Sequence, residues 1–226
     1  MDEYRYELKY VCSETQLAIL QARMKGILAV DPHARDGSYC IRSLYFDDYN
    51  NSCFFENRDG TDAREKYRIR VYVHDFGGIR LERKRSLRGK TQKTACPITR
   101  EQCFALMNGE PADAYGETPP LMKTLVSKFQ TRLMRPKVIV EYDRTPYTYE
   151  SGNVRITLDK NIRSSNMLDG FFDQQLCARP VMPRGQHVLE VKYDGFLPSF
   201  LRQLLQLDSM QRTAYSKYYF SRNFSL

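Results

Sequence analysis

Basic side chains that recur at every second position are the residues best suited to chemistry in this chain. In residues 66–72, Lys66, Arg68 and Arg70 alternate with tyrosine, isoleucine and valine. Because successive side chains of a β-strand point to opposite faces, these three cations would share one face. Arginine offers a planar fork of donors that matches phosphate oxygens, and lysine adds a point charge. The pattern is therefore typical of a surface that binds polyanions.

Carboxylates share the strand faces of such cations. The pairs are Glu7 with Lys9, Glu82 with Lys84, and Glu190 with Lys192. Hard carboxylate oxygens bind magnesium or manganese, and an excess of cations offsets the charge of phosphate groups. Together these side chains suit a bound chain of phosphates and its divalent metal ion.

Two arrangements of the strands are open from the residues alone. An antiparallel sheet could leave its charged face in water and pack helices on its apolar face. A closed barrel could instead enclose the charges, with the helices outside. Ordinary solvated strand faces mix Thr, Ser, Gln and Asn freely, whereas these faces repeat cations and carboxylates. This difference favours the enclosed arrangement.

The composition fits one folded domain over residues 1–226. Hydrophobic residues make up 42% and charged residues 27%, and the net charge of +8 favours polyanionic partners. The six cysteines form no CxxC pair and the three histidines have no ligand spacing, which argues against a zinc site. The sequence shows neither a signal peptide nor a membrane span, so we expect a soluble, intracellular protein.

Hydrophobic periodicity and capping residues predict the elements that position these side chains. Capping boxes of Ser13 with Gln16 and of Thr99 with Gln102 start two helices. We expect helices over residues 14–25, 99–109, 120–134 and 198–207; strands over 4–11, 41–47, 66–72, 79–85, 91–98, 137–144, 147–149, 154–159 and 188–192; turns at 48–52 and 75–78; a long loop at 108–120; and a Tyr-rich terminal segment at 212–220. Residues 161–185 carry no clear pattern.

A series of short motifs runs along residues 4–219. They are ELK at 7–9, SLYFD at 43–47, REKYRIRVY at 64–72, LERK at 81–84, EYDR at 141–144, VRITLD at 154–159, LEVK at 189–192 and SKY at 216–218. In this order and spacing they resemble the VTC polyphosphate polymerase domain, a branch of the triphosphate tunnel metalloenzymes. The resemblance covers nearly the whole chain.

The resemblance implies an α+β fold: an antiparallel eight-stranded β-barrel that forms a triphosphate tunnel, with helices packed outside. It implies catalytic roles for Arg68, Arg70, Lys84, Arg144, Arg155 and Lys217; substrate binding by Lys9, Lys66, Lys93, Tyr142 and Lys192; and metal binding by Glu190, Glu7 and Glu82. The implied cofactor is Mn²⁺ or Mg²⁺. The hydrolase branch usually places two alternating glutamates before the lysine, and here Arg5 holds the first of those positions. This departure matches the polymerase branch and removes one metal ligand.

The implied reaction transfers the γ-phosphate of ATP to a growing inorganic polyphosphate chain. A triphosphatase on the same fold, acting on inorganic or nucleoside triphosphate, would differ only in using water as the acceptor. A non-catalytic polyanion binder is a third interpretation; the basic run at residues 83–90 is its best sign, although nucleic acid is the less expected ligand. The resemblance also implies a membrane-protein partner, which could hold a cytoplasmic protein at the inner face of a membrane.

Overall fold

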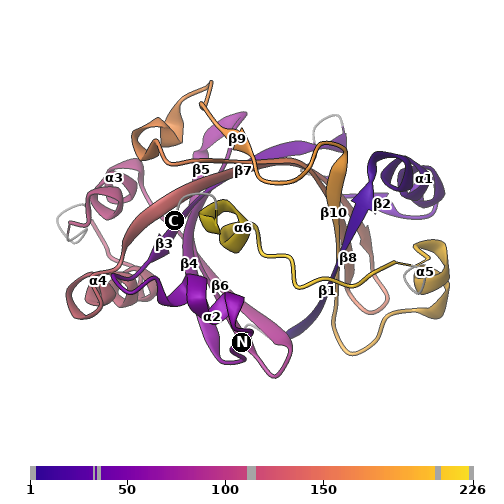
Figure 1. Cartoon of the computed structure of the whole chain (residues 1–226), viewed down its shortest axis with the longest axis horizontal. Helices are drawn as coiled ribbons and strands as arrows, with labels where there is room; N and C mark the ends of the chain where they lie inside the picture. The colour runs from indigo at the N-terminus through magenta and orange to yellow at the C-terminus, as the bar shows by residue number, and fades with distance from the viewer. Residues whose placement is uncertain (1–3, 33, 35–36, 111–115, 207–209, 224–226) are drawn as a thin grey trace.

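Eight antiparallel strands close into a barrel in the computed structural model, which describes residues 4–32, 34, 37–110, 116–206 and 210–223 (Figure 1). The barrel strands are β1 (Arg5–Ser13), β3 (Tyr39–Asp47), β4 (Arg64–Tyr72), β5 (Asp75–Leu87), β6 (Lys90–Pro97), β7 (Arg135–Tyr149), β8 (Val154–Ser165) and β10 (Gln186–Tyr193). Their order is β7-β3-β4-β5-β6-β1-β10-β8, and pairing of β8 with β7 closes the ring. The short strands β2 (Ala29–Val30) and β9 (Arg179–Pro180) pair with β7 and β8. The predicted barrel is confirmed.

The two faces of each strand separate as the alternation predicts. In β4, Tyr67 and Ile69 are fully buried in an apolar layer outside the barrel, whereas Lys66, Arg68 and Arg70 line its interior. The charged faces are therefore enclosed, and the open-sheet alternative is wrong. Enclosure of so many ionised groups is tolerated when each has partners of opposite charge.

Helices cover the outer surface of the barrel on two opposite sides (Figure 1). The helices α3 (Arg100–Asn108) and α4 (Pro120–Thr131) and the 3₁₀ helix η3 (Leu168–Phe172) pack on β3, β4 and β5. The helices α1 (Glu14–Met24) and α5 (Ser199–Leu204) pack on β1, β8 and β10. Both predicted capping boxes are present, at Ser13 and Thr99. None of the described helices is long and apolar enough to cross a membrane.

The C-terminal helix α6 (Lys217–Asn223) lies within the outline of the barrel rather than on its outer surface (Figure 1). Tyr218 of α6 packs beside Tyr45 of β3, with ring centroids 5.4 Å apart, and joins an apolar cluster that also holds Tyr142 of β7. The helix α2 (Ser52–Arg58) contacts α6 and contributes Phe54 to the same cluster. One part of the barrel interior is therefore filled by protein.

Among neighbouring strands of the barrel, β1 and β6 are paired over the shortest length. These strands pair at two positions, Arg5 with Thr91 and Tyr6 with Lys90. Farther along β1, the wall is continued by residues 210–216, which we call the C-terminal strap. Its Thr213 N–H donates to the Lys9 carbonyl at 2.9 Å, beside a β-bridge between Arg212 and Tyr10. The C-terminal strap therefore runs along β1 and continues directly into α6 inside the barrel.

Several strands extend beyond their predicted limits. Residues 137–144 and 147–149 form one strand, β7, through Pro146, whose carbonyl accepts a hydrogen bond from the Asp31 N–H at 3.2 Å. The hairpin turns before Asp75 rather than at residues 75–78, because extended backbone accommodates Gly77 and Gly78 within β5. Residues 161–185, which carried no clear pattern, hold the end of β8, η3 and β9.

Two predicted helices are shorter than expected, and one was missed. The helix α4 ends at Thr131, since Leu133 takes a left-handed φ of 52°. The helix α5 ends at Leu204; residue 207 of its predicted range lies outside the described residues, as do residues 111–115 of the long loop. The helix α2 follows the predicted turn at 48–52 directly. Its first turn is capped by Asp47, which accepts hydrogen bonds from the N–H groups of Cys53 and Phe54.

Candidate functional site

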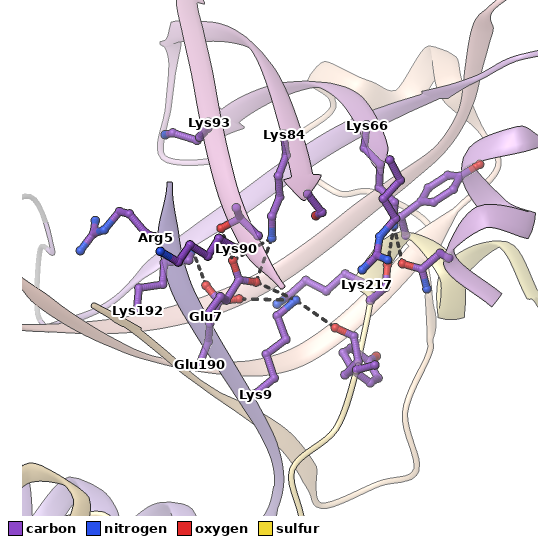
Figure 2. Close-up of a pocket in the computed structure, with 18 of the residues that line it drawn as sticks. Arg5, Glu7, Lys9, Lys66, Lys84, Lys90, Lys93, Glu190, Lys192 and Lys217 are labelled. Atoms are coloured by element: carbon purple, nitrogen blue, oxygen red, sulfur yellow. Dashed lines mark hydrogen bonds and ion pairs between the residues drawn. The ribbon is translucent and has the colours of Figure 1, made fainter. Parts of the chain in front are cut away.

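A cavity of about 840 Å³ occupies the rest of the barrel interior, and side chains from all eight barrel strands line it (Figure 2). Every site residue predicted from the sequence lies on its wall: Glu7, Lys9, Lys66, Arg68, Arg70, Glu82, Lys84, Lys93, Tyr142, Arg144, Arg155, Glu190, Lys192 and Lys217. The strand alternation therefore brings together residues that are far apart in the sequence. Arg5 and Thr91, to which the sequence assigned no binding role, also line the cavity.

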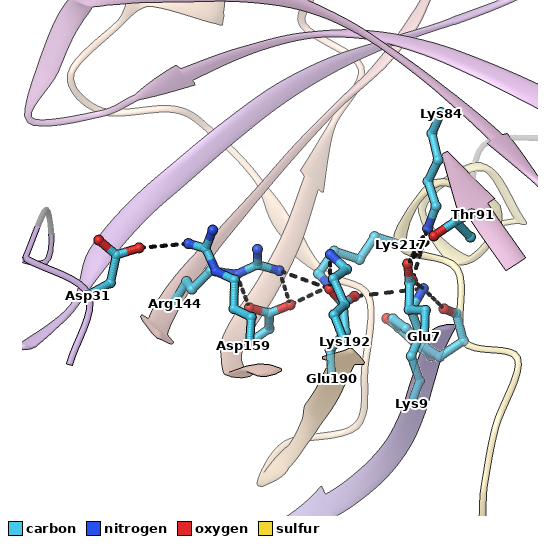
Figure 3. A network of polar contacts seen from close by, with 12 residues as sticks. Glu7, Lys9, Asp31, Lys84, Thr91, Arg144, Asp159, Glu190, Lys192 and Lys217 are labelled. Atoms are coloured by element: carbon cyan, nitrogen blue, oxygen red, sulfur yellow. Dashed lines mark hydrogen bonds and ion pairs between the residues drawn. The ribbon is translucent and has the colours of Figure 1, made fainter. Parts of the chain in front are cut away.

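Glu7 lies at the centre of one group of cations (Figures 2 and 3). Lys84 donates to both of its oxygens at 2.8 Å, Lys9 lies 3.0 Å away, and the Thr91 hydroxyl donates at 3.3 Å. Burial opposes ionisation of this carboxyl, but Lys84, Lys9 and Lys192 outweigh it and hold the pKa of Glu7 well below its usual range. Glu7 is therefore an anion at neutral pH.

Glu190 forms the second carboxylate of the same group. Its oxygens lie 2.5 Å from Lys192 Nζ, 3.9 Å from Lys9 Nζ and 4.0 Å from the Arg144 guanidinium. Burial and the neighbouring Glu7 oppose its ionisation, yet these cations keep the pKa of Glu190 far below its ordinary value. Lys9 contacts both carboxylates, which raise its pKa above the ordinary value although burial acts in the opposite direction.

Glu82 anchors a separate group on β4, β5 and β6. The Arg68 guanidinium donates to one oxygen at 2.7 and 2.9 Å, while Arg70 and Lys93 lie 3.1 and 3.3 Å from the other. Burial would raise the pKa of Glu82, but Arg68, Arg70 and Lys93 hold it below the usual range. The carboxylate thereby orients two arginines toward the cavity and fixes their spacing.

Asp159 holds the third group together, and sequence analysis gave it no role. It accepts two hydrogen bonds from the Arg144 guanidinium, at 2.6 and 2.8 Å, and lies 2.5 Å from Lys217 Nζ (Figure 3). Arg144 and Lys217 also lie over the ring of Tyr142, at 5.2 and 4.7 Å from its centroid. Aromatic faces attract cations, so Tyr142 helps to hold both side chains in place.

Arg155 and Lys66 differ from the other predicted cations. Arg155 donates to Asp31 and to the Tyr39 hydroxyl, both at 2.9 Å, and Asp31 lies at the edge of the network in Figure 3. The Lys66 ammonium instead contacts neutral oxygens, at 2.6 Å from Asn57 Oδ1 and 3.0 Å from Ser216 Oγ. It has no salt bridge to a carboxylate among the residues that the structure describes.

Glu7 and Glu190 are the side chains that fit a divalent metal ion. They lie close enough to share Lys9, and magnesium is commonly bound by one or two carboxylates together with substrate phosphates and water. Within the described part of the chain, no three His, Cys, Asp or Glu side chains gather as a metal site. Glu82 belongs to the separate group with Arg68 and Arg70. The metal-binding roles of Glu7, Glu82 and Glu190 stay predictions.

A second buried ionic network lies outside the cavity. Arg42 lies 2.5 Å from Glu141, which also pairs with Arg163, and the same guanidinium donates to the carbonyls of Phe171 and Asp173 at 2.9 and 2.6 Å. These contacts fasten η3 and the segment after it to β3, β7 and β8. The network therefore has a structural role, which the local sequence did not reveal because its carbonyl acceptors lie far along the chain.

An eight-stranded antiparallel barrel that encloses cations and carboxylates is the triphosphate tunnel fold. The chain belongs to the VTC domain family, because the family model matches residues 4–225. No curated protein matches the sequence.

Solved structures share this fold at low sequence identity. A putative adenylyl cyclase from Hippeastrum, described as having a dominant triphosphatase activity, is 13% identical with a TM-score of 0.60, over 99% of this chain and 97% of that chain. A putative adenylate cyclase from Bacillus halodurans is also 13% identical, with a TM-score of 0.57 over 96% of each chain. The protein PH1819 from Pyrococcus horikoshii is 14% identical, with a TM-score of 0.52 over 98% and 99%. At these identities the likeness establishes the fold alone.

Proposed function

We propose that the protein is a polyphosphate polymerase, which transfers the γ-phosphate of ATP to the end of a growing inorganic polyphosphate chain with the help of Mn²⁺ or Mg²⁺. The observation that carries the proposal is the cavity, which is lined by cations from strands all around the barrel. Membership in the VTC domain family supports the same substrate class. A membrane-protein partner at the inner face of a membrane would receive the polymer.

The reaction needs no nucleophile from the protein, because an oxygen of the acceptor phosphate attacks the γ-phosphorus of ATP while the bond to the β,γ-bridging oxygen breaks and ADP leaves. Catalysis then consists of aligning the two phosphates and stabilising the charge that spreads over the transferred group. Arg68 and Arg70, held by Glu82, and Arg144, held by Asp159, are oriented donors for the phosphoryl oxygens. Such preorganised donors need little rearrangement during the reaction.

Glu7 and Glu190 would hold the metal ion, with Lys9, Lys84 and Lys192 around them. When bound, the metal would supply positive charge that offsets the charge of the phosphate groups. The lysines contribute charge and keep both carboxylates ionised at neutral pH. In the protein without substrate these lysines are the counterions of the two carboxylates, so a polyanionic substrate would compete with Glu7 and Glu190 for them and leave carboxylate oxygens open to a metal ion.

A triphosphatase is the second candidate function. It is favoured by the Hippeastrum protein, which shares the fold and is described as having that activity. The same donors would stabilise the transferred phosphoryl group, and water would replace the acceptor phosphate. The position of Arg5, where the hydrolase branch has a glutamate, favours the polymerase.

The test is to incubate the purified protein with ATP and Mn²⁺, and to follow polyphosphate on a stained gel and free phosphate in solution. A ladder of polymer with little free phosphate is the expected result. Free phosphate or tripolyphosphate without a ladder would overturn the polymerase in favour of the triphosphatase. Binding without turnover would leave a non-catalytic polyphosphate binder.

A further inference from the structure

Lys66 is a half-buried cation of the cavity that has no negative partner among the residues that the structure describes. Its neighbours on the wall are paired: Arg68 with Glu82, Lys84 with Glu7, and Lys217 with Asp159. Within the described part of the chain, the Lys66 ammonium is held by the neutral oxygens of Asn57 and Ser216, and the Tyr218 ring lies 5.4 Å from it. In Figure 2 it lies apart from Glu7 and Glu190.

Charged groups on the elements around Lys66 are mainly cations. Lys84 lies directly opposite on β5, Lys9 faces it from β1, and Arg64 precedes it on β4. From α2, the Cys53 thiol acts on Lys66, and burial and Asp47 raise the pKa of this thiol, so that it stays neutral. The site therefore has donors and positive charge, but none of the described carboxylates forms a salt bridge with Lys66.

We propose that Lys66, Asn57 and Ser216 form a subsite for a phosphoryl group of the polyphosphate chain that carries no metal ion, and that Lys66 takes up a proton from solvent when this group binds. The inference rests on the proposed function in taking polyphosphate or triphosphate as the ligand. It adds which part of the cavity binds a phosphoryl group without metal, and how pH controls that binding.

The electrostatic surroundings of Lys66 couple the binding of a phosphoryl group to the protonation of this side chain. Burial, together with Lys84, Lys9 and Arg64, lowers the pKa of Lys66 to about 7. Above that pH the side chain of the free protein is mostly a neutral amine. An anionic phosphoryl oxygen beside it would favour the ammonium form and raise its pKa. By linkage, the anion then binds with uptake of a proton and binds more weakly as pH rises.

The absence of carboxylates at Lys66 in the described structure is what separates this subsite from the metal position. A divalent ion needs hard anionic oxygens, which Glu7 and Glu190 offer and Asn57 and Ser216 do not. A phosphate chain that runs along the cavity would therefore have metal-bound phosphoryl groups near Glu7 and Glu190, and a phosphoryl group without metal beside Lys66.

The test is calorimetric titration of the full chain with tripolyphosphate in EDTA, at pH 6 and pH 8, each in two buffers of different ionisation enthalpy. Proton uptake follows from the buffer dependence of the heat. Lys66→Arg keeps a permanent charge at position 66 and Lys66→Met removes the charge, so neither variant can take up a proton there. Two variants are used so that the test stands if one of them does not fold. Lys123→Arg, on the exposed side of α4, is the matched control. Lys84, whose pKa is lowered to about 8 mainly by burial, is present in every variant.

At pH 8, wild type and the Lys123→Arg control should take up close to one proton more than either Lys66 variant, and at pH 6 this difference should vanish. Relative to Lys66→Arg, wild-type affinity should fall about tenfold from pH 6 to pH 8. Equal uptake by wild type and Lys66→Arg would overturn the inference while leaving the polymerase untouched. The expected difference without a polymer ladder would overturn the polymerase alone. Failure of wild type to bind tripolyphosphate would overturn both.

Discussion

Lys217, the first residue of α6, lies 2.5 Å from the carboxylate of Asp159 on β8. The Asp159 side chain has no solvent exposure, and that of Lys217 is 9% exposed. This ion pair ties the C-terminal helix to the inner wall of the barrel. The same carboxylate holds Arg144, so a single anion positions two predicted catalytic cations. The order of the site and the placement of α6 are therefore linked.

Asp159→Asn should destabilise the protein by about 3–5 kcal/mol, because it leaves Arg144 and Lys217 buried without their counterion. Urea unfolding followed by circular dichroism measures this change. Asp59→Asn is the control, since Asp59 pairs with Arg58 at the surface, where loss of a salt bridge has little effect on stability. Equal effects of the two substitutions would contradict the role given to Asp159.

Arg70→Ala should lower turnover of ATP by roughly three orders of magnitude, the scale of an arginine that stabilises a transferred phosphoryl group. The fold should survive, since Arg68 and Lys93 still neutralise Glu82. Initial rates and a thermal melt of the same sample test both parts. Arg80→Ala is the matched control. Arg80 lies opposite Arg70 in the register of β4 and β5, but it is exposed and is not part of the cavity wall. A rate like that of wild type in Arg70→Ala would defeat the assignment.

Glu190→Gln should raise the Mn²⁺ concentration needed for half-maximal turnover at least tenfold, since an amide is a poorer ligand than a carboxylate. Chelation with EDTA should stop turnover of the wild type while tripolyphosphate still binds through the cations. Rates across a metal titration and binding in EDTA provide the measurements. Turnover that persists in EDTA would exclude the metal-dependent mechanism.

Lys66→Met should stabilise the protein without ligand, by roughly 4 kcal/mol at pH 7, because charging a partly buried lysine among cations is unfavourable. The pKa of Lys66 is lowered in the folded state, so the unfolded chain binds more protons between pH 7 and about 10. Wild-type stability should therefore rise with pH relative to Lys66→Met, and the two should converge near pH 10. Thermal melts across this range test it; a gap that does not change with pH would disprove it.

Much of the site could be predicted because period-two alternation is a local signal. Lys66, Arg68 and Arg70 alternate with buried residues, so one inward face follows once the barrel is assumed. The pairing of Arg144 with Asp159 could not be predicted, since it depends on the register between β7 and β8. The sequence placed Asp159 on a common face with Arg155 but contained no information on the residue opposite.

The missed helix α2 and the inward position of α6 have a common cause. Asp47 caps α2 and also accepts a hydrogen bond from the Tyr218 hydroxyl, from the other end of the chain. Such contacts are set by tertiary structure, whereas the local signals at residues 48–52 are those of a turn. The carboxylate therefore has a structural role that joins the two helices.

The pairing of β1 has a consequence for how the chain reaches this structure. The first strand of the barrel lies between β10 and the short contact with β6, so Tyr6 must meet Tyr193, almost the whole length of the chain away. Folds dominated by such distant pairings form slowly. During synthesis, β1 and β8 would present unpaired edges, which are prone to aggregation, until β10 emerges from the ribosome and pairs with both.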